Sequence, residues 1–406
     1  MSNDNNVIRF DQTQSAPVEQ AAAATIAPEQ AAPAEQAAPA APVAEQAAPA
    51  PAAPVMEANE AQPAPQATTH DNPNIDAATG RGLDVGTANL LGVTQDANGE
   101  ITVKRERNAF LEIPAAYRGN RDMLTKLNVP YVSYKDRLFV LGDAAFNLAN
   151  MFGQEVRRPM ADGFLSPAEQ DAIPMMRFII HRLLGDPKVQ GEKVCFCIPA
   201  PSIDKQNDTV YHEGIVSGIL RKLGYSPQSM NEGHAVVYSS LAEQDFTGIG
   251  ISCGGGMFNI CVAYKTIPAV KFSVARGGDW IDEHVAKVMG IPRTRATAIK
   301  EGDVNLMDPK TREEEAVVLY YRNLISYVLQ NLKQRFQLAR DVPQFTDPVE
   351  VVVAGGTSLV GGFVELFAEE LQKINFPLQI AGVRRADDAI SSVVRGCLIA
   401  AALEDK

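Results

Sequence analysis

The chain has 406 residues, is 46% hydrophobic and 21% charged, and carries a formal net charge of −12. This length suffices for two ordinary domains with large cores. The acidic balance argues against direct nucleic-acid binding, which usually needs a basic excess. The chain also has no apolar run of about 18 residues, so we expect no membrane-spanning helix.

The cysteines and the start of the chain predict a compartment. The five cysteines are an odd number, and none forms a CxxC pair. The opening segment is polar and no apolar segment follows it, unlike a secretory signal. We therefore expect a cytoplasmic protein with reduced thiols. Cys195 and Cys197 alternate within an apolar stretch, and we interpret both as packing residues of a strand.

Residues 1–78 form a tail rich in alanine, proline, glutamine and glutamate. The tail holds ten acidic residues and one basic residue, so it carries −9 of the net charge of −12. Frequent prolines and scarce aromatics oppose a packed core, which predicts a disordered acidic tether. The tether is either a solvating spacer or an arm with a docking peptide at residues 7–10 for an unidentified protein partner. Anionic lipid would repel it, so direct membrane contact is not expected.

Beyond the tail, the apolar pattern predicts strands and helices that alternate as in an α/β protein. The expected strand–turn–strand units cover residues 83–93 and 246–265. The other expected strands cover residues 100–107, 137–141, 193–198 and 349–353. The expected helices cover residues 169–184, 203–223, 231–241, 282–289, 313–340, 364–374 and 387–403. A strand–turn–strand unit followed by strand and helix units therefore occurs twice, which predicts two related halves.

Three glycine-rich turns follow apolar strands. They are Gly82-Leu-Asp-Val-Gly-Thr87, Ser252-Cys-Gly-Gly-Gly-Met257 and Ala354-Gly-Gly-Thr357. Glycine lets backbone N–H groups approach phosphate oxygens without a side-chain clash. Three such turns in order predict a nucleotide clamped between the two halves.

These turns and their order resemble the actin-like ATPase superfamily, and most of all bacterial actins of the MreB and MamK type. The resemblance covers about residues 80–403. Its other segments are Phe139-Val-Leu-Gly-Asp-Ala-Ala-Phe146, Arg158-Pro-Met-Ala-Asp-Gly163, Ala275-Arg-Gly-Gly-Asp279 with Asp282, Val353-Ala-Gly-Gly-Thr-Ser358 and the closing helix at Ser391–Ala401.

The resemblance implies an actin-like α/β fold in which two duplicated mixed-sheet domains flank a nucleotide cleft. The implied domains are residues 79–245, with a small subdomain at about 116–159, and residues 246–386, with a small subdomain at about 284–344. Residues 387–406 would form a closing helix that returns to the first domain.

The resemblance also implies roles for individual residues. Asp84 would hold Mg²⁺, usually through water. Glu232 would be the catalytic residue that orients the attacking water. The residues implied to bind ATP are Asp84, Gly86, Thr87, Asn89, Gly254, Gly255, Gly256, Gly277, Gly278, Lys300, Glu301, Gly355, Gly356 and Thr357. Read without the resemblance, Asp84 could cap a turn, and Glu232, Lys300 and Glu301 could be solvated helix residues.

The second glycine turn departs from the family pattern. Ser252 replaces an aspartate, Met257 replaces a hydroxyl residue and Asn259 replaces a second acid, while the glycines remain. Loss of a positioned catalytic group commonly slows a reaction by orders of magnitude. We therefore expect nucleotide binding to be kept and hydrolysis to be slow.

Three classes of function remain open at this point. The first is a cytoskeletal protein whose nucleotide-bound form assembles with itself into filaments. The second is a non-polymerising actin-fold adaptor or switch of the FtsA, PilM or chaperone-reactivase type. The third, a sugar kinase, would need an aspartate base near an acceptor hydroxyl, and no aspartate has a convincing context. The residues leave the choice between ATP and GTP open.

Overall fold

A computed structural model of the chain describes residues 7–9, 80–96, 98–113, 118–152, 155–161, 163–166, 169–206, 209–340 and 342–403. The chain divides into two compact units, and all described residues belong to the unit that comprises Met1–Phe10 and Ala64–Lys406. The other unit, Asp11–Pro63, lies outside the described residues. Of the predicted tail, residues 1–78, the structure describes only residues 7–9, which form a strand.

A five-stranded sheet forms the first half of the fold, in the order β11-β10-β2-β3-β4. Its strands are β2 (Arg81–Val85), β3 (Asn89–Gln95), β4 (Ile101–Arg107), β10 (Lys193–Ile198) and β11 (Ser226–Asn231). Strands β2, β10 and β11 are parallel, and β2, β3 and β4 form an antiparallel meander. The sheet is therefore mixed, as the sequence predicts.

A six-stranded sheet forms the second half, in the order β1-β16-β15-β12-β13-β14. Its strands are β1 (Val7–Arg9), β12 (Gly248–Cys253), β13 (Phe258–Tyr264), β14 (Ile267–Val274), β15 (Val349–Ala354) and β16 (Ile380–Arg385). Strands β12, β15 and β16 are parallel, and β12, β13 and β14 are antiparallel. Without β1, this sheet has the same strand order and directions as the first sheet, so the fold is duplicated.

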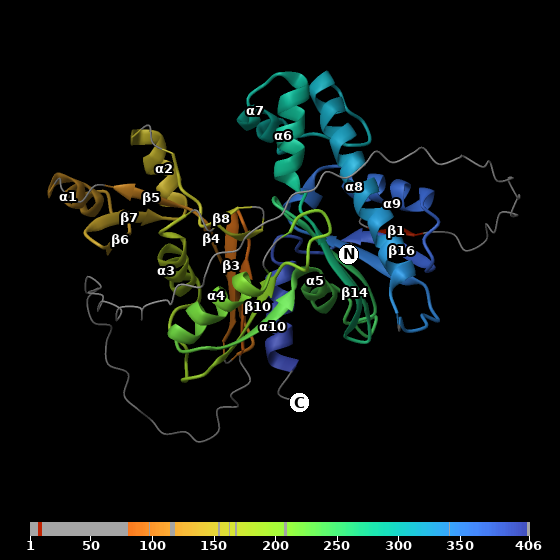
Figure 1. Cartoon of the computed structure of the whole chain (residues 1–406), viewed down its shortest axis with the longest axis horizontal. Helices are drawn as coiled ribbons and strands as arrows, with labels where there is room; N and C mark the ends of the chain where they lie inside the picture. The colour runs from red at the N-terminus through yellow and green to blue at the C-terminus, as the bar shows by residue number, and fades with distance from the viewer. Residues whose placement is uncertain are drawn as a thin grey trace, which may run out of the picture. The chain divides into compact units, whose positions relative to one another are not determined.

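Helices pack on both sheets and between them (Figure 1). On the outer side of the first sheet lie α3 (Ala172–Leu184) and α4 (Thr209–Lys222); between the sheets lie α5 (Glu232–Ser240) and α10 (Ser392–Leu403). On the outer side of the second sheet lie α6 (Gly278–Met289), α8 (Arg312–Leu338) and α9 (Phe363–Lys373). The alternation of strand residues explains this layering, because Val194 and Phe196 face α3 and α4 while Cys195 and Cys197 face α10.

Smaller elements extend each half. They are β5 (Phe110–Ile113), α1 (Arg118–Lys126), β6 (Tyr131–Tyr134), β7 (Arg137–Leu141), α2 (Asp143–Phe152), β8 (Met160–Ala161), β9 (Phe164–Leu165), α7 (Arg293–Lys300) and the short 3-10 helix η2 (Gly356–Leu359). Strands β5, β7 and β6 form a separate antiparallel sheet in the first half. Among the helices of the described ranges, none combines the length and the apolar character needed to span a bilayer.

The structure differs from the sequence-based expectations at several element ends. Strand β11 was not expected, because it is polar and contains Pro227; a proline is tolerated there since β11 is an edge strand. Helix α4 begins at Thr209 rather than at residue 203, since the backbone N–H of Ile203 donates instead to Ser273 of β14. Residues 7–9 pair with a sheet edge, although the whole segment 1–78 was expected to be disordered.

Candidate functional site

The three glycine turns lie at the carboxyl ends of the central strands, which is where open α/β sheets bind ligands. The first turn follows β2, the second follows β12 and the third follows β15. Helix α5 begins with Glu232 immediately after the edge strand β11. Direct contacts join the halves here, since the Ser252 hydroxyl donates to Glu232 over 2.9 Å and the Ala200 N–H donates to Asn259 Oδ1 over 2.9 Å.

The first turn is held by backbone and side-chain hydrogen bonds. The N–H of Gly86 donates to the carbonyl of Asn89 at 3.1 Å, and the buried Asn108 amide donates to the carbonyl of Gly86 at 3.0 Å. The hydroxyl of Thr87 accepts a hydrogen bond from the N–H of Gly163 at 2.8 Å. The structure thus brings Gly86, Thr87 and Asn89 into one tight turn beside the end of β2.

The second and third turns contact each other directly. The Thr357 hydroxyl donates to the carbonyl of Gly254 at 2.9 Å, and the Gly278 N–H donates to the same carbonyl at 3.2 Å. A Cβ atom on Gly277 would lie 2.4 Å from the carbonyl oxygen of Gly255, so only glycine fits this approach. These contacts gather the predicted glycines of the second half, which are Gly254, Gly255, Gly256, Gly277, Gly278, Gly355 and Gly356.

The predicted Lys300–Glu301 pair separates in the structure. The ammonium of Lys300 is 2.8 Å from the buried carboxylate of Asp282 and donates to the carbonyl of Gly278 at 3.0 Å. Lys300 is therefore anchored at the wall of the glycine turns. Glu301 follows the last residue of α7 and is exposed. Lys300 therefore lies among the predicted site residues, whereas Glu301 is exposed to solvent.

Two carboxyl groups lie at the base of the site, one on each side of β10. The thiol of Cys197 donates to Asp84 over 2.9 Å. Burial raises the pKa of Asp84 from 3.8 to about 6, while the hydrogen bond from Cys197 opposes this shift. Burial and the nearby charge of Asp84 raise the pKa of Glu232 from 4.5 to about 8, against the hydrogen bond from Ser252. The two carboxyl groups are therefore incompletely ionised at neutral pH, and a bound cation would stabilise their ionised forms.

The three departures in the second turn have structural consequences. Ser252 is buried, and its hydroxyl occupies one carboxylate oxygen of Glu232. Asn259 is buried, and its Nδ2 group has no hydrogen-bond partner within the described ranges. Met257 is buried against Gly163, where an added Cβ would lie 2.2 Å from its sulfur. The site thus keeps its glycine backbone but presents a hydroxyl, an amide and a thioether where the family pattern has acids and a hydroxyl.

The residues present fit a Mg²⁺–nucleotide. The glycine turns leave room for phosphate, since a Cβ on Gly255 would meet no atom closer than 3.9 Å. The unpartnered Nδ2 of Asn259 is a donor available to an oxygen ligand. Across the described residues, no group of three or more His, Cys, Asp or Glu side chains is arranged to hold a metal by itself. A cation beside Asp84 would therefore take most of its ligands from phosphate and water, as Mg²⁺ commonly does.

Sequence reasoning missed three residues that support the site. Cys197, interpreted as a packing residue, also donates to Asp84; its place at the end of the strand beside β2 was the available signal. Asn108 fixes the first turn, and no motif in the chain pointed to this role. Asp282 was noted only as part of a motif, and it anchors Lys300.

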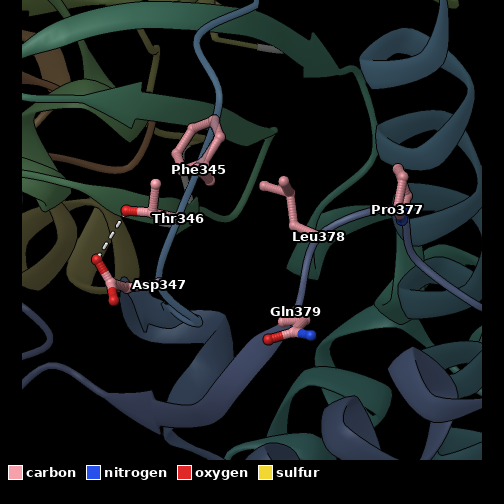
Figure 2. A pocket seen from close by; sticks show the side chains of 6 residues that line it. All are labelled: Phe345, Thr346, Asp347, Pro377, Leu378 and Gln379. Carbon is pink, nitrogen blue, oxygen red and sulfur yellow. Dashed lines mark hydrogen bonds between the residues drawn. The ribbon is translucent and has the colours of Figure 1, made fainter. Parts of the chain in front are cut away.

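A surface pocket lies away from this site (Figure 2). It is lined by Phe345, Thr346, Asp347, Pro377, Leu378 and Gln379. These residues precede β15 and β16, so the pocket lies at the amino ends of parallel strands whose carboxyl ends carry the glycine turns. The pocket therefore lies at the end of the second sheet that is opposite to the glycine turns.

The duplicated sheets and the glycine turns give the chain an actin-like fold, similar to the folds of MamK and MreB5 structures. A double-helical MamK filament structure aligns with a TM-score of 0.61 at 19% identity, covering 80% of this chain and 98% of that one. MreB5 of Spiroplasma citri bound to AMPPNP aligns with a TM-score of 0.56 at 16% identity, covering 78% of this chain and 94% of that one. No curated protein sequence matches the chain. The family model described as Volactin matches residues 80–401, and the chain belongs to the Volactin family.

The raised pKa of Glu232 predicts how the stability of the nucleotide-free protein depends on pH. The folded state keeps a proton on Glu232 up to about pH 8, whereas the unfolded state loses it near 4.5. The unfolded state therefore binds fewer protons in this window, and the free energy of unfolding falls as pH rises from about 5 to 8. We expect Glu232→Gln to flatten this decline, as measured by urea denaturation in EDTA. The matched change at exposed Glu283 should leave the decline as steep as in the unaltered protein; a Gln variant at 232 with the same slope would contradict the prediction.

Proposed function

We propose that this protein binds ATP with Mg²⁺ between its two halves and assembles into nucleotide-dependent filaments. The observation that supports nucleotide binding best is the convergence of three glycine turns with Asp84 and Glu232. Backbone N–H groups in such turns suit phosphate oxygens. The AMPPNP complexes of a non-polymerising MamK mutant and of MreB5 support the same proposal by analogy of fold.

We assign a role to each part of the site. Asp84 holds the Mg²⁺ through water, and the glycine turns with Thr87 and Thr357 bind the phosphates and the nucleoside. Lys300, fixed by Asp282, approaches the nucleoside from the wall of the second half, and Asn89 and Glu301 line the rim. A cation bound beside Asp84 would favour the ionised form of Glu232, which could then accept a proton from the attacking water.

Hydrolysis is proposed to be slow. The hydroxyl of Ser252 donates to Glu232 and so opposes its action as a base. No carboxylate replaces the one that the family pattern has at position 252. A slow step after binding would prolong the ATP-bound state, and with it the assembled state.

Self-association is the proposed partner interaction, because an actin-like subunit presents different faces at its two ends and head-to-tail contacts extend without closure. The MamK structure is itself a filament. The five cysteines are all free and buried, which suits a reducing compartment such as the cytoplasm.

Electron microscopy of purified protein with ATP, with ADP and without nucleotide tests the proposal. We expect filaments with ATP and few or none without nucleotide. Gly255→Glu adds a carboxylate at the proposed phosphate site, where a Cβ atom would meet no atom closer than 3.9 Å, and should abolish ATP binding and filaments. Gly214→Glu on the exposed surface of α4 is the matched control, since a Cβ there meets no atom within 4 Å. ATP binding without filaments under any condition would favour a non-polymerising switch instead.

A further inference from the structure

Strand β1 is an addition to the duplicated plan of the fold. Both sheets share the same five-strand order, and β1 is a sixth strand on the outer edge of β16. It pairs antiparallel with β16, with Val7 opposite Arg384, Ile8 opposite Val383 and Arg9 opposite Gly382. Figure 1 shows this short strand, in red, next to β16 and close to α9. The edge of β16 is therefore a docking site for an extended peptide.

The edge that receives β1 is firmly fixed by the rest of the fold. Val383 is fully buried in the core of the second half. The Arg384 guanidinium donates to Glu350 at 3.0 Å and to the carbonyl of Ser240 at 2.5 Å. Strand β16 also pairs with β15 along its inner side. The edge thus keeps its shape, with its outward N–H and C=O groups available, when β1 is not bound.

The pairing itself is short and therefore exchangeable. It involves three residues of β1, so it comprises few hydrogen bonds, each of modest net value in water. A strand of this length on a fixed edge can leave and be replaced by an identical strand. The contacts made are the same whichever copy supplies the strand, as in domain swapping.

The chain between β1 and the first half is long enough for such an exchange. Residues 10–79 separate β1 from the described part of the first half. Covalent geometry allows at most about 3.6 Å per residue, so this connection could span up to roughly 250 Å. A second copy of the chain is therefore within reach of the segment that carries β1.

We propose that, in the assembled protein, β1 of one copy pairs with β16 of a neighbouring copy and links the two subunits. This inference rests on the proposed self-assembly. In dilute solution, the covalent connection gives a chain's own β1 a higher effective concentration at its β16 edge than the β1 of any other copy has. Within an assembly, the neighbouring edge is held at a comparable effective concentration. Exchange then leaves the number of strand pairings unchanged, because every β16 edge that loses its own β1 receives the β1 of a neighbouring copy.

Disulfide trapping tests the exchange. Ile8 and Val383 lie directly opposite each other, at a separation that suits a disulfide. One full-length chain carries Ile8→Cys, and a second, of different mass through a tag, carries Val383→Cys. The two are mixed, assembled with ATP and treated with a mild oxidant such as diamide. We expect a cross-linked species of the summed mass, at least tenfold more abundant with ATP than without nucleotide.

The controls separate this inference from the proposed assembly. Ile380→Cys lies on the same strand outside the β1 register, and in place of Val383→Cys it should give at least tenfold less cross-link. The double variant Ile8→Cys/Val383→Cys reports pairing within a chain, while electron microscopy of the same samples reports assembly. Filaments with only within-chain cross-links would overturn strand exchange and leave the assembly proposal standing. If no filaments form and only within-chain cross-links appear, both strand exchange and the assembly proposal are overturned. If no sample yields a cross-link, strand exchange is overturned.

Discussion

We expect Ser252→Asp to raise the rate of ATP hydrolysis by about tenfold or more. The substitution removes the hydroxyl that donates to Glu232 and supplies a carboxylate at the end of β12. An additional carboxylate at this position can hold the cation or the attacking water, and a correctly positioned acid–base group is commonly worth about 10²–10⁴ in rate. Phosphate release at saturating ATP and Mg²⁺ measures the effect.

Two further variants identify the source of any gain. Ser252→Ala removes the hydrogen bond without adding a carboxylate, and we expect a rate change of less than about threefold, since one uncharged hydrogen bond contributes modestly. Adding Glu232→Gln to Ser252→Asp should remove the gain, because the proposed base is lost. An aspartate variant that binds ATP as tightly as the unaltered protein but hydrolyses it no faster would contradict our account of Ser252.

We expect Gly396→Ala to destabilise the fold strongly. Gly396 lies on α10 where that helix crosses α5, and a Cβ atom there would lie 1.9 Å from the carbonyl oxygen of Ala235. The obstruction is backbone, so relief requires the two helices to separate between the sheets. Overpacking of this kind typically costs about 1–3 kcal/mol and occasionally more. Urea denaturation without nucleotide measures the loss.

The matched control is Gly218→Ala in α4. A Cβ atom at Gly218 meets no other atom within 4 Å, and the residue lies within a helix. Alanine there should stabilise the protein by about 0.4–1 kcal/mol, because it restricts the unfolded chain without strain. If both alanine variants unfolded at the same urea concentration, close packing of α10 on α5 would not be a main determinant of stability.

Much of the fold follows from local patterns in the sequence. The strands β10, β12 and β15 are short, mostly apolar runs, and β12 and β15 lead into glycine turns; this pattern depends only on neighbouring residues. The duplication is visible for the same reason, since each half repeats the same succession of elements. The polar strand β11 escaped prediction because its backbone pairing with β10, rather than its own composition, makes it a strand.

The candidate site was predictable in its glycines and less so in its polar contacts. The turns at Gly86, Gly254 and Gly355 carry their own signature, because close backbone approach needs glycine. The hydrogen bond from Ser252 to Glu232 joins residues of different halves, and that from Cys197 to Asp84 joins neighbouring strands far apart in sequence. Contacts of this kind arise only after the sheets have formed and the halves have packed.

By itself, the sequence determined the class of fold, the repeat of its two halves and the residue types at each glycine turn. These are local properties, set by side-chain periodicity and by the backbone freedom of glycine. The tertiary structure alone decided that Ser252 engages Glu232, that Lys300 is fixed by Asp282 while Glu301 faces solvent, and that residues 7–9 complete a sheet edge. Each of these depends on segments far apart in the chain, whose meeting is set by the packing of sheets and helices and not by any local pattern.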